Sequence, residues 1–188
     1  LSRRINFLGS DSNDTFGGHT MVASSQGVGR FSGVGAVSMG QLNTRARYPF
    51  HMHALGVGGR ASYFVECAVM DSFFRAYTVH YTNHSRVERN VAYNVDGFAV
   101  YLEDGVEESN LFRYNFMAHV HPIGQPADGG GGQGGTLATN SSTLLVPSDI
   151  TASGYYISNS NNDFIGNAAS GGWSGFAFPG LDHWFGIA

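Results

Sequence analysis

The sequence has no lysine, a single cysteine and few charged residues, and each shortage excludes a class of protein. All ten basic residues are arginine and the net charge is −4 at pH 7, so no overall positive field attracts nucleic acid or an anionic membrane. Cys67 has no partner for an internal disulfide and lies in an apolar run, which predicts a buried free thiol. Charged residues make up 13% and hydrophobic residues 42% of the chain, a composition that excludes a disordered chain and a coiled coil.

Long apolar segments are absent as well. No apolar run approaches the roughly 18 to 20 residues that span a bilayer, and Leu1-Ser2-Arg3-Arg4 is not followed by the apolar core of a signal peptide. We therefore expect no membrane insertion by this segment. The chain begins without methionine and stops at Phe185-Gly186-Ile187-Ala188 without a polar tail. We interpret residues 1–188 as one domain of a larger protein.

Glycine is abundant, with 27 of the 188 residues, about twice the usual share of roughly 7%. Hydrophobic residues occur in short runs rich in Val, Phe and Tyr, and these runs are broken by Gly, Asn, Asp and Ser. This pattern is typical of short β-strands joined by turns. The exception is the stretch from Ser62 to Tyr77, which is long enough for a buried helix. Its periodicity alone does not distinguish a helix from short strands.

A repeated asparagine favours strands over a helix in this stretch. Asn90, Asn115 and Asn167 are spaced by 25 and 52 residues, each opens an apolar run, and Cys67 stands 23 residues before Asn90. Reading the 52 residues as two turns of about 26 gives coils of 23 to 26 residues with these four positions in register. This period predicts an all-β, right-handed parallel β-helix, a pectin-lyase-like solenoid in which one asparagine stacks on the next.

The stretch from Asp128 to Gly135 reads Asp-Gly-Gly-Gly-Gly-Gln-Gly-Gly and has no apolar side chain. We expect a flexible Gly-rich insert at residues 124–143. It is not a phosphate-binding loop, because that motif requires a lysine.

Several motifs, in order, resemble one β-helix family. Residues 47–53 read Arg-Tyr-Pro-Phe-His-Met-His, similar to the Arg-Tyr-Pro-Ile-His-Phe-His motif of the G8-domain surface proteins. The similarity continues at residues 75–80, 87–90, 102–107 and 161–172. The family includes the cell-migration-inducing hyaluronidases, the transmembrane hyaluronidase-like protein and fibrocystin-L. The resemblance implies a parallel β-helix and an extracellular or cell-surface location reached through the secretory pathway.

The chain departs from the family pattern at three histidine positions. Ser38 stands where a histidine usually precedes Met-Gly-Gln, Met70 and Asp71 replace a His-His pair, and Phe98 replaces a histidine after glycine. We therefore favour a structural, non-enzymatic segment of the fibrocystin-L type, which presents surfaces to other surface proteins or glycans. The hyaluronidase branch implies the alternative, a hyaluronidase-like polysaccharide hydrolase.

Strand alternation defines a candidate site. If Phe50 and Met52 point inward, then His51 and His53 share the outer wall. The same parity places His80 and Glu103 outward, in one column with His53, and Thr78 and Tyr101 in a second column with His51, because neighbouring strands lie about 4.8 Å apart. A divalent metal, calcium or zinc, would be held by His51, His53 and His80. Acid–base cleavage of a glycosidic bond would use His51, His53, Glu103, Asp104 and Glu107.

These residues also have a structural interpretation. Glu103-Asp104-Gly105 has the composition of a turn in which the aspartate caps backbone amides. Tripeptides that begin at Asn13, Asn83 and Asn140 fit the N-glycosylation pattern. Matches of this kind also arise by chance in a chain rich in Asn, Ser and Thr, so they agree with a secretory route without establishing it.

Overall fold

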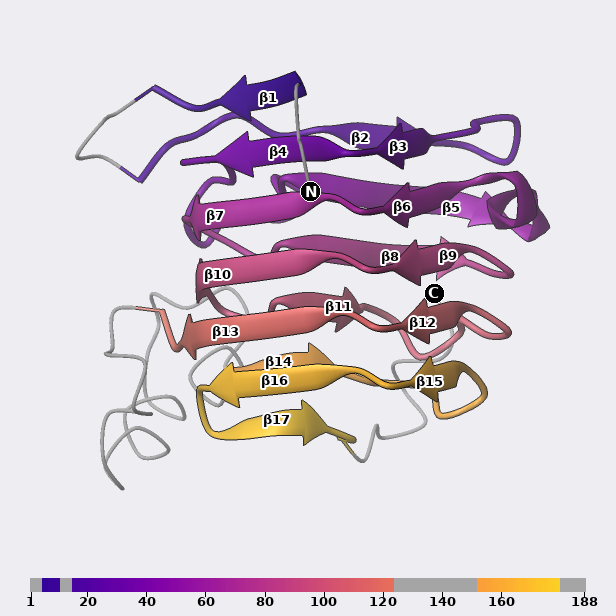
Figure 1. Ribbon diagram of the computed structural model, residues 1–188. Coiled ribbons are helices and arrows are strands. Elements are labelled where there is room, and N and C mark those ends of the chain that lie inside the picture. Colours follow the sequence, from indigo (N-terminus) through magenta and orange to yellow (C-terminus); the bar gives the residue numbers. More distant parts are fainter. Residues whose placement is uncertain (1–4, 11–14, 124–151, 180–188) are drawn as a thin grey trace.

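The chain winds through successive coils, and each complete coil contains three short strands, in a computed structural model that describes residues 5–10, 15–123 and 152–179. Strands of consecutive coils pair in parallel and form two six-stranded sheets and one five-stranded sheet. In Figure 1 the coils are stacked in chain order, from the indigo N-terminal strands at the top to the yellow C-terminal strands at the bottom. The predicted parallel β-helix is confirmed.

The three sheets run the length of the stack. The first sheet contains, in spatial order, β1 (Ile5–Leu8), β4 (Val34–Val37), β7 (Ala68–Ser72), β10 (Val91–Asp96), β13 (Phe116–His121) and β16 (Ala168–Gly171). The second sheet contains β17 (Ser174–Ala177), β14 (Ser153–Tyr156), β11 (Val100–Leu102), β8 (Tyr77–Thr82), β5 (Phe50–Gly56) and β2 (Met21–Ala23). The third sheet contains β15 (Asp163–Ile165), β12 (Leu111–Arg113), β9 (Arg86–Glu88), β6 (Tyr63–Val65) and β3 (Arg30–Ser32).

Helix is nearly absent from the described residues. A short 3-10 helix, η1 (Val57–Ala61), follows β5. The stretch from Ser62 to Tyr77 forms β6 and β7 and the start of β8, so its apolar run is divided among the three sheets. Within the described ranges the chain contains no helix with the length and hydropathy to cross a bilayer.

Side chains alternate across each strand, and the inward set forms one continuous core. Phe50 and Met52 on β5 and Val79 on β8 are fully buried in it. Because the same slot recurs in every coil, inward rings stack along the axis of the stack. The rings of Phe50 and Tyr77 are nearly parallel, with centroids 5.5 Å apart. The predicted inward parity of the strands is confirmed.

Asparagines form a ladder at the turn between the third and first sheets. The Oδ1 atom of Asn90 accepts a hydrogen bond from the backbone N–H of Cys67 at 2.8 Å. Asn115 accepts from Asn90 at 2.9 Å, and Asn167 accepts from Asn115 at 3.0 Å. The four predicted positions are therefore in register, and Cys67 is a buried free thiol as expected.

A second ladder stabilises the turn between the second and third sheets. Asn110 accepts hydrogen bonds from the backbone N–H and the hydroxyl of Ser85. Asn162 accepts in turn from the backbone N–H of Asn110 at 2.9 Å. The sequence analysis missed this ladder, although Asn110 and Asn162 show the same spacing of 52 residues as Asn115 and Asn167.

The spacing of 52 residues corresponds to one coil, so the interpretation as two coils of about 26 residues was wrong. Strand β12 pairs directly with β15, and β13 pairs with β16. Residue spacing does not distinguish two coils from one coil that carries an insertion. The extra length lies between β13 and β14. The predicted Gly-rich insert at residues 124–143 lies outside the described residues.

Candidate functional site

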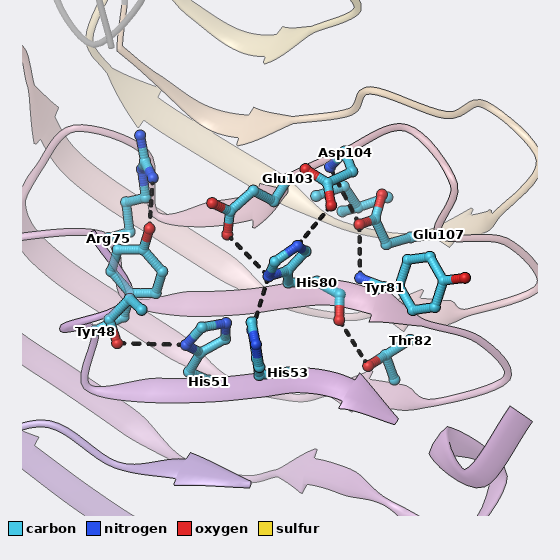
Figure 2. A network of polar contacts seen from close by, with 12 residues as sticks. Tyr48, His51, His53, Arg75, His80, Tyr81, Thr82, Glu103, Asp104 and Glu107 are labelled. Atoms are coloured by element: carbon cyan, nitrogen blue, oxygen red, sulfur yellow. Dashed lines mark hydrogen bonds and ion pairs between the residues drawn. The ribbon is translucent and has the colours of Figure 1, made fainter. Parts of the chain in front are cut away.

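Three histidines and two carboxylates meet on the outer face of the second sheet. Strand β5 carries His51 and His53, β8 carries His80, and Glu103 and Asp104 directly follow β11. The register places His53 opposite His80, and the pairing of β8 with β11 brings Glu103 level with His80. The structure therefore contains the predicted column, whose side chains point toward one another in Figure 2.

His80 is at the centre of the polar contacts. Its Nδ1 atom lies 2.8 Å from Nδ1 of His53 and 3.5 Å from Oε2 of Glu103. Its Nε2 atom lies 2.6 Å from Oδ2 of Asp104. Both ring nitrogens of His80 are thus engaged, one on each side of the ring (Figure 2). This arrangement fixes the orientation of the imidazole.

His51 lies on the outer wall, as predicted, but the chain covers it. Its side chain is buried, with the residue 1% exposed. The segment before β5 folds over it, so that the ring of Tyr48 lies 4.9 Å from the imidazole and the Ala46 carbonyl oxygen lies 3.4 Å from Nδ1. Burial, together with the neighbouring His53 and His80, lowers the pKa of His51 from 6.5 to about 3. His51 is therefore neutral at physiological pH.

Burial also shifts the two flanking groups. It raises the pKa of Glu103 above its usual range, against the opposing effect of His80 and Arg75. It lowers the pKa of His53, and the adjacent His80 acts in the same direction. The site therefore favours neutral groups, with the partly exposed Asp104 at its rim.

Arg75 is buried next to the site, and the sequence analysis assigned it no role. The guanidinium lies 3.7 Å from the ring centroid of Tyr101 and 4.6 Å from that of Phe74. Its Nη1 atom donates a hydrogen bond to the Tyr48 hydroxyl at 2.8 Å. The signal in the sequence is a lone arginine between aromatic and apolar residues, because burying its charge requires stacked rings and an acceptor.

Glu107 is placed apart from the histidines. Its carboxylate accepts hydrogen bonds from the backbone N–H groups of Tyr81, Asp104 and Gly105. Glu107, rather than Asp104, therefore caps the turn that follows β11. The carboxylate holds Asp104 in position against His80 and does not point into the site (Figure 2).

The residues that replace family histidines lie in different surroundings. Met70 is on β7 in the first sheet and is exposed, so it does not fill the space beside the second sheet's histidines. Phe98 is buried, and its ring packs against those of Tyr101 and Tyr156. Of the three sequons, those at Asn13 and Asn140 lie outside the described residues, whereas Oδ1 of Asn83 accepts from the backbone N–H of Glu108.

Comparison with known proteins shows which family the chain belongs to. Residues 15–187 match the family described as CEMIP beta-helix. The chain belongs to this family. It is 52% identical over 182 residues to a G8 domain-containing protein of Dictyostelium discoideum, covering 97% of the chain and 12% of the relative. Communication mutant protein F of the same organism is 50% identical over 184 residues, covering 96% of the chain and 16% of that relative.

A mammalian relative shares the family more distantly. Fibrocystin-L of Mus musculus is 34% identical over 176 residues, covering 90% of the chain and 4% of its own length. The chain thus spans a small fraction of each of these relatives. No solved structure matches the chain. The resemblance to the G8-domain proteins and to fibrocystin-L is confirmed.

Proposed function

We propose that this chain is a structural and interaction segment of a larger surface protein and presents its outer faces to partner proteins or glycans. The observation that carries the proposal is an apolar patch on the first sheet. Met70, Tyr93 and Phe116, on the adjacent strands β7, β10 and β13, are 45%, 48% and 49% exposed. The ring of Tyr93 stacks on that of His119, with centroids 5.3 Å apart.

Such a patch suits a binding surface because exposed apolar side chains gathered on one face mark interaction sites. The parallel sheet beneath it holds the side chains in fixed register, and aromatic rings bind sugar faces or apolar protein surfaces. Membership of a family that includes fibrocystin-L supports a location outside the cell or at its surface. The sequon at Asn83 agrees with that location.

The test compares two surfaces of the same solenoid. The purified chain is passed over a panel of immobilised matrix polysaccharides, hyaluronan among them, and of purified surface-protein ectodomains. We expect retention on at least one member, and at least tenfold weaker retention when Met70, Tyr93 and Phe116 are all changed to serine. Ile165→Ser, at a similarly exposed residue on the third sheet, is the matched control. Equal retention of the triple variant, or no retention of the unmodified chain, contradicts the proposal.

The hydrolase remains a second candidate because one observation favours it. Glu103 has its pKa raised by burial, as in a general acid, and lies beside the paired side chains of His80 and Asp104. The chain is incubated with hyaluronan and calcium or zinc, and polymer length is measured. Depolymerisation that disappears in His51→Ala or Glu103→Ala establishes the hydrolase. Unchanged polymer length supports the structural function.

A further inference from the structure

We propose that His51, His53, His80 and Glu103 form a zinc site on the outer face of the second sheet. The inference goes beyond the interaction function and does not depend on it, because a bound metal stabilises a solenoid whether or not the chain has an enzymatic activity. Four features of the described residues carry it: the convergence of ligand atoms, the orientation of the rings, buried atoms without partners, and the chemistry of the donor set.

The first feature is distance. One ring nitrogen from each of His51, His53 and His80 lies within 4.8 Å of the other two. Two ligands on a tetrahedral zinc, at about 2.0 Å from the metal, are about 3.3 Å apart. The Nδ1 atoms of His53 and His80, now 2.8 Å apart, open by about half an ångström to admit the ion. Side-chain rotation provides movements of this size without displacing the strands.

The second feature is the orientation of two rings by neighbouring acceptors. The Nε2–H of His80 donates to Asp104 at 2.6 Å, which leaves the Nδ1 lone pair directed at His53 and Glu103. The Nδ1–H of His51 faces the carbonyl oxygen of Ala46 at 3.4 Å, which leaves its Nε2 lone pair available. Zinc-binding histidines in proteins usually donate their other N–H to a carboxylate or a backbone carbonyl in this way.

The third feature is a pair of buried acceptors without hydrogen bonds. Among the described residues, neither Nε2 of His51 nor Oε2 of Glu103 has a hydrogen-bond partner. An unsatisfied buried polar atom costs about 1 to 3 kcal/mol. With Nε2–H of His80 donated to Asp104, the Nδ1 atom of His80 faces this Glu103 oxygen at 3.5 Å with a lone pair. A cation among these atoms gives each acceptor a partner.

The fourth feature selects the metal. Three neutral imidazoles and one carboxylate are the donor set of a tetrahedral zinc site, whereas calcium takes six to eight oxygen ligands. Among these donors, the carboxylate of Glu103 supplies the negative charge that balances the ion. Of the two metals expected from the sequence, this geometry selects zinc.

The experiment measures metal binding directly. The chain, free of any histidine tag and dialysed against a chelator, is titrated with zinc by calorimetry and, in parallel, with cobalt followed by visible absorption. We expect one equivalent of zinc and the intense absorption bands of tetrahedral cobalt. His80→Ala and His51→Ala lower the affinity at least a hundredfold, and Glu103→Gln lowers it about tenfold. His119→Ala, an exposed histidine on the first sheet, binds zinc as the unmodified chain does.

Folding is controlled separately. Circular dichroism reports whether each variant retains its β-structure, and His53→Gln, which keeps a polar side chain of similar reach, replaces any alanine variant that unfolds. Zinc raises the Tm of the unmodified chain and of His119→Ala, and leaves that of the ligand variants unchanged. Failure to bind one equivalent of zinc, or undiminished binding by folded His51 and His53 variants, overturns the proposal. So does a site that binds calcium in preference to zinc. Surface retention and polymer length, measured on the same samples, report on the proposed function independently.

Discussion

A few single residues bury part of the outer face of the second sheet, which would otherwise be in contact with water. Arg75 is 1% exposed and is surrounded by aromatic rings. Through its hydrogen bond to the Tyr48 hydroxyl it fixes the segment that covers His51. A β-helix normally leaves outward side chains in water, so this cover creates the low-dielectric surroundings that shift the pKa values of the site.

The first prediction follows from the pKa of His51. In the folded chain this pKa is about 3, against 6.5 for an unperturbed histidine, so the unfolded chain binds the proton first as the pH falls. Stability is therefore lost progressively below pH 6.5. Between pH 7 and pH 5 this one group removes about 2 kcal/mol from the free energy of unfolding. Urea titrations of metal-free chain at the two pH values measure the loss.

The matched variant is His51→Phe, which keeps a ring at this position and removes the titrating group. Its stability should fall by about 2 kcal/mol less over the same pH interval. The raised pKa of Glu103 has the opposite effect on stability. The folded chain holds the Glu103 proton more tightly than the unfolded chain, so this group adds stability as the pH falls. It acts in both proteins, so the difference between them isolates His51. Parallel pH profiles would refute the assignment.

The second prediction concerns Arg75. Lysine at this position keeps the charge but lacks the planar group that stacks on Tyr101 while donating to Tyr48. We expect Arg75→Lys to lower the free energy of unfolding by about 1 to 3 kcal/mol, because a buried ammonium loses its partners. Chemical denaturation measures this change. Arg60→Lys, at an exposed arginine, should change stability by less than about 0.5 kcal/mol; an equal effect of the two substitutions would contradict the stacking argument.

At the scale of the elements, the turns hold the coils in register. Each rung of the asparagine ladder gives a backbone N–H of one coil a side-chain acceptor from the next coil. The residue before the rung has a positive φ, 51° at Arg89 and 55° at Tyr114, so the chain bends sharply there. The asparagine side chain accepts hydrogen bonds from backbone N–H groups that the bend prevents from pairing within the sheets.

The third prediction removes one rung. Asn115 accepts from the backbone N–H and the side chain of Asn90 and donates to Val87 and Asn167. Asn115→Ala leaves several buried polar groups unpaired, and we expect a loss of about 3 kcal/mol in the free energy of unfolding. Asn161→Ala, at an exposed asparagine, should cost less than about 0.5 kcal/mol. Similar denaturation midpoints for the two variants would show that the ladder is not stabilising.

Local rules explain which elements the sequence could predict. The inward position of Phe50 and Met52 follows from strand alternation, and the ladder positions follow from equal spacing. Neither rule describes what lies outside a coil. For that reason the cover over His51, the aromatic surroundings of Arg75 and the capping role of Glu107 were not predictable. Each depends on a loop whose path is set by tertiary packing.

At the scale of the whole molecule, the ends of the solenoid differ from its middle. An inner coil is covered on both sides. Among the described residues, β17, the last strand of the second sheet, has a neighbouring strand on one side only, β14. The ring of Phe176 stacks in parallel on that of Tyr155, with centroids 4.5 Å apart. Phe176 is nonetheless 38% exposed. Within the part of the chain that the structure describes, this end therefore presents both an apolar ring and an open strand edge, a combination that promotes association between strands.

The last prediction is that the isolated chain associates through this end. Sedimentation velocity should show an average mass that rises with concentration up to about 100 μM, a range typical of weak contacts. Phe176→Arg places a charge on the open stack and should weaken association at least tenfold, because the guanidinium loses water when two ends meet. Tyr114→Arg, at an exposed residue between β12 and β13 on the side of the stack, should associate as the unmodified chain does. If the unmodified chain sediments as a monomer throughout this range, or if both variants weaken association equally, the end coil is not the contact.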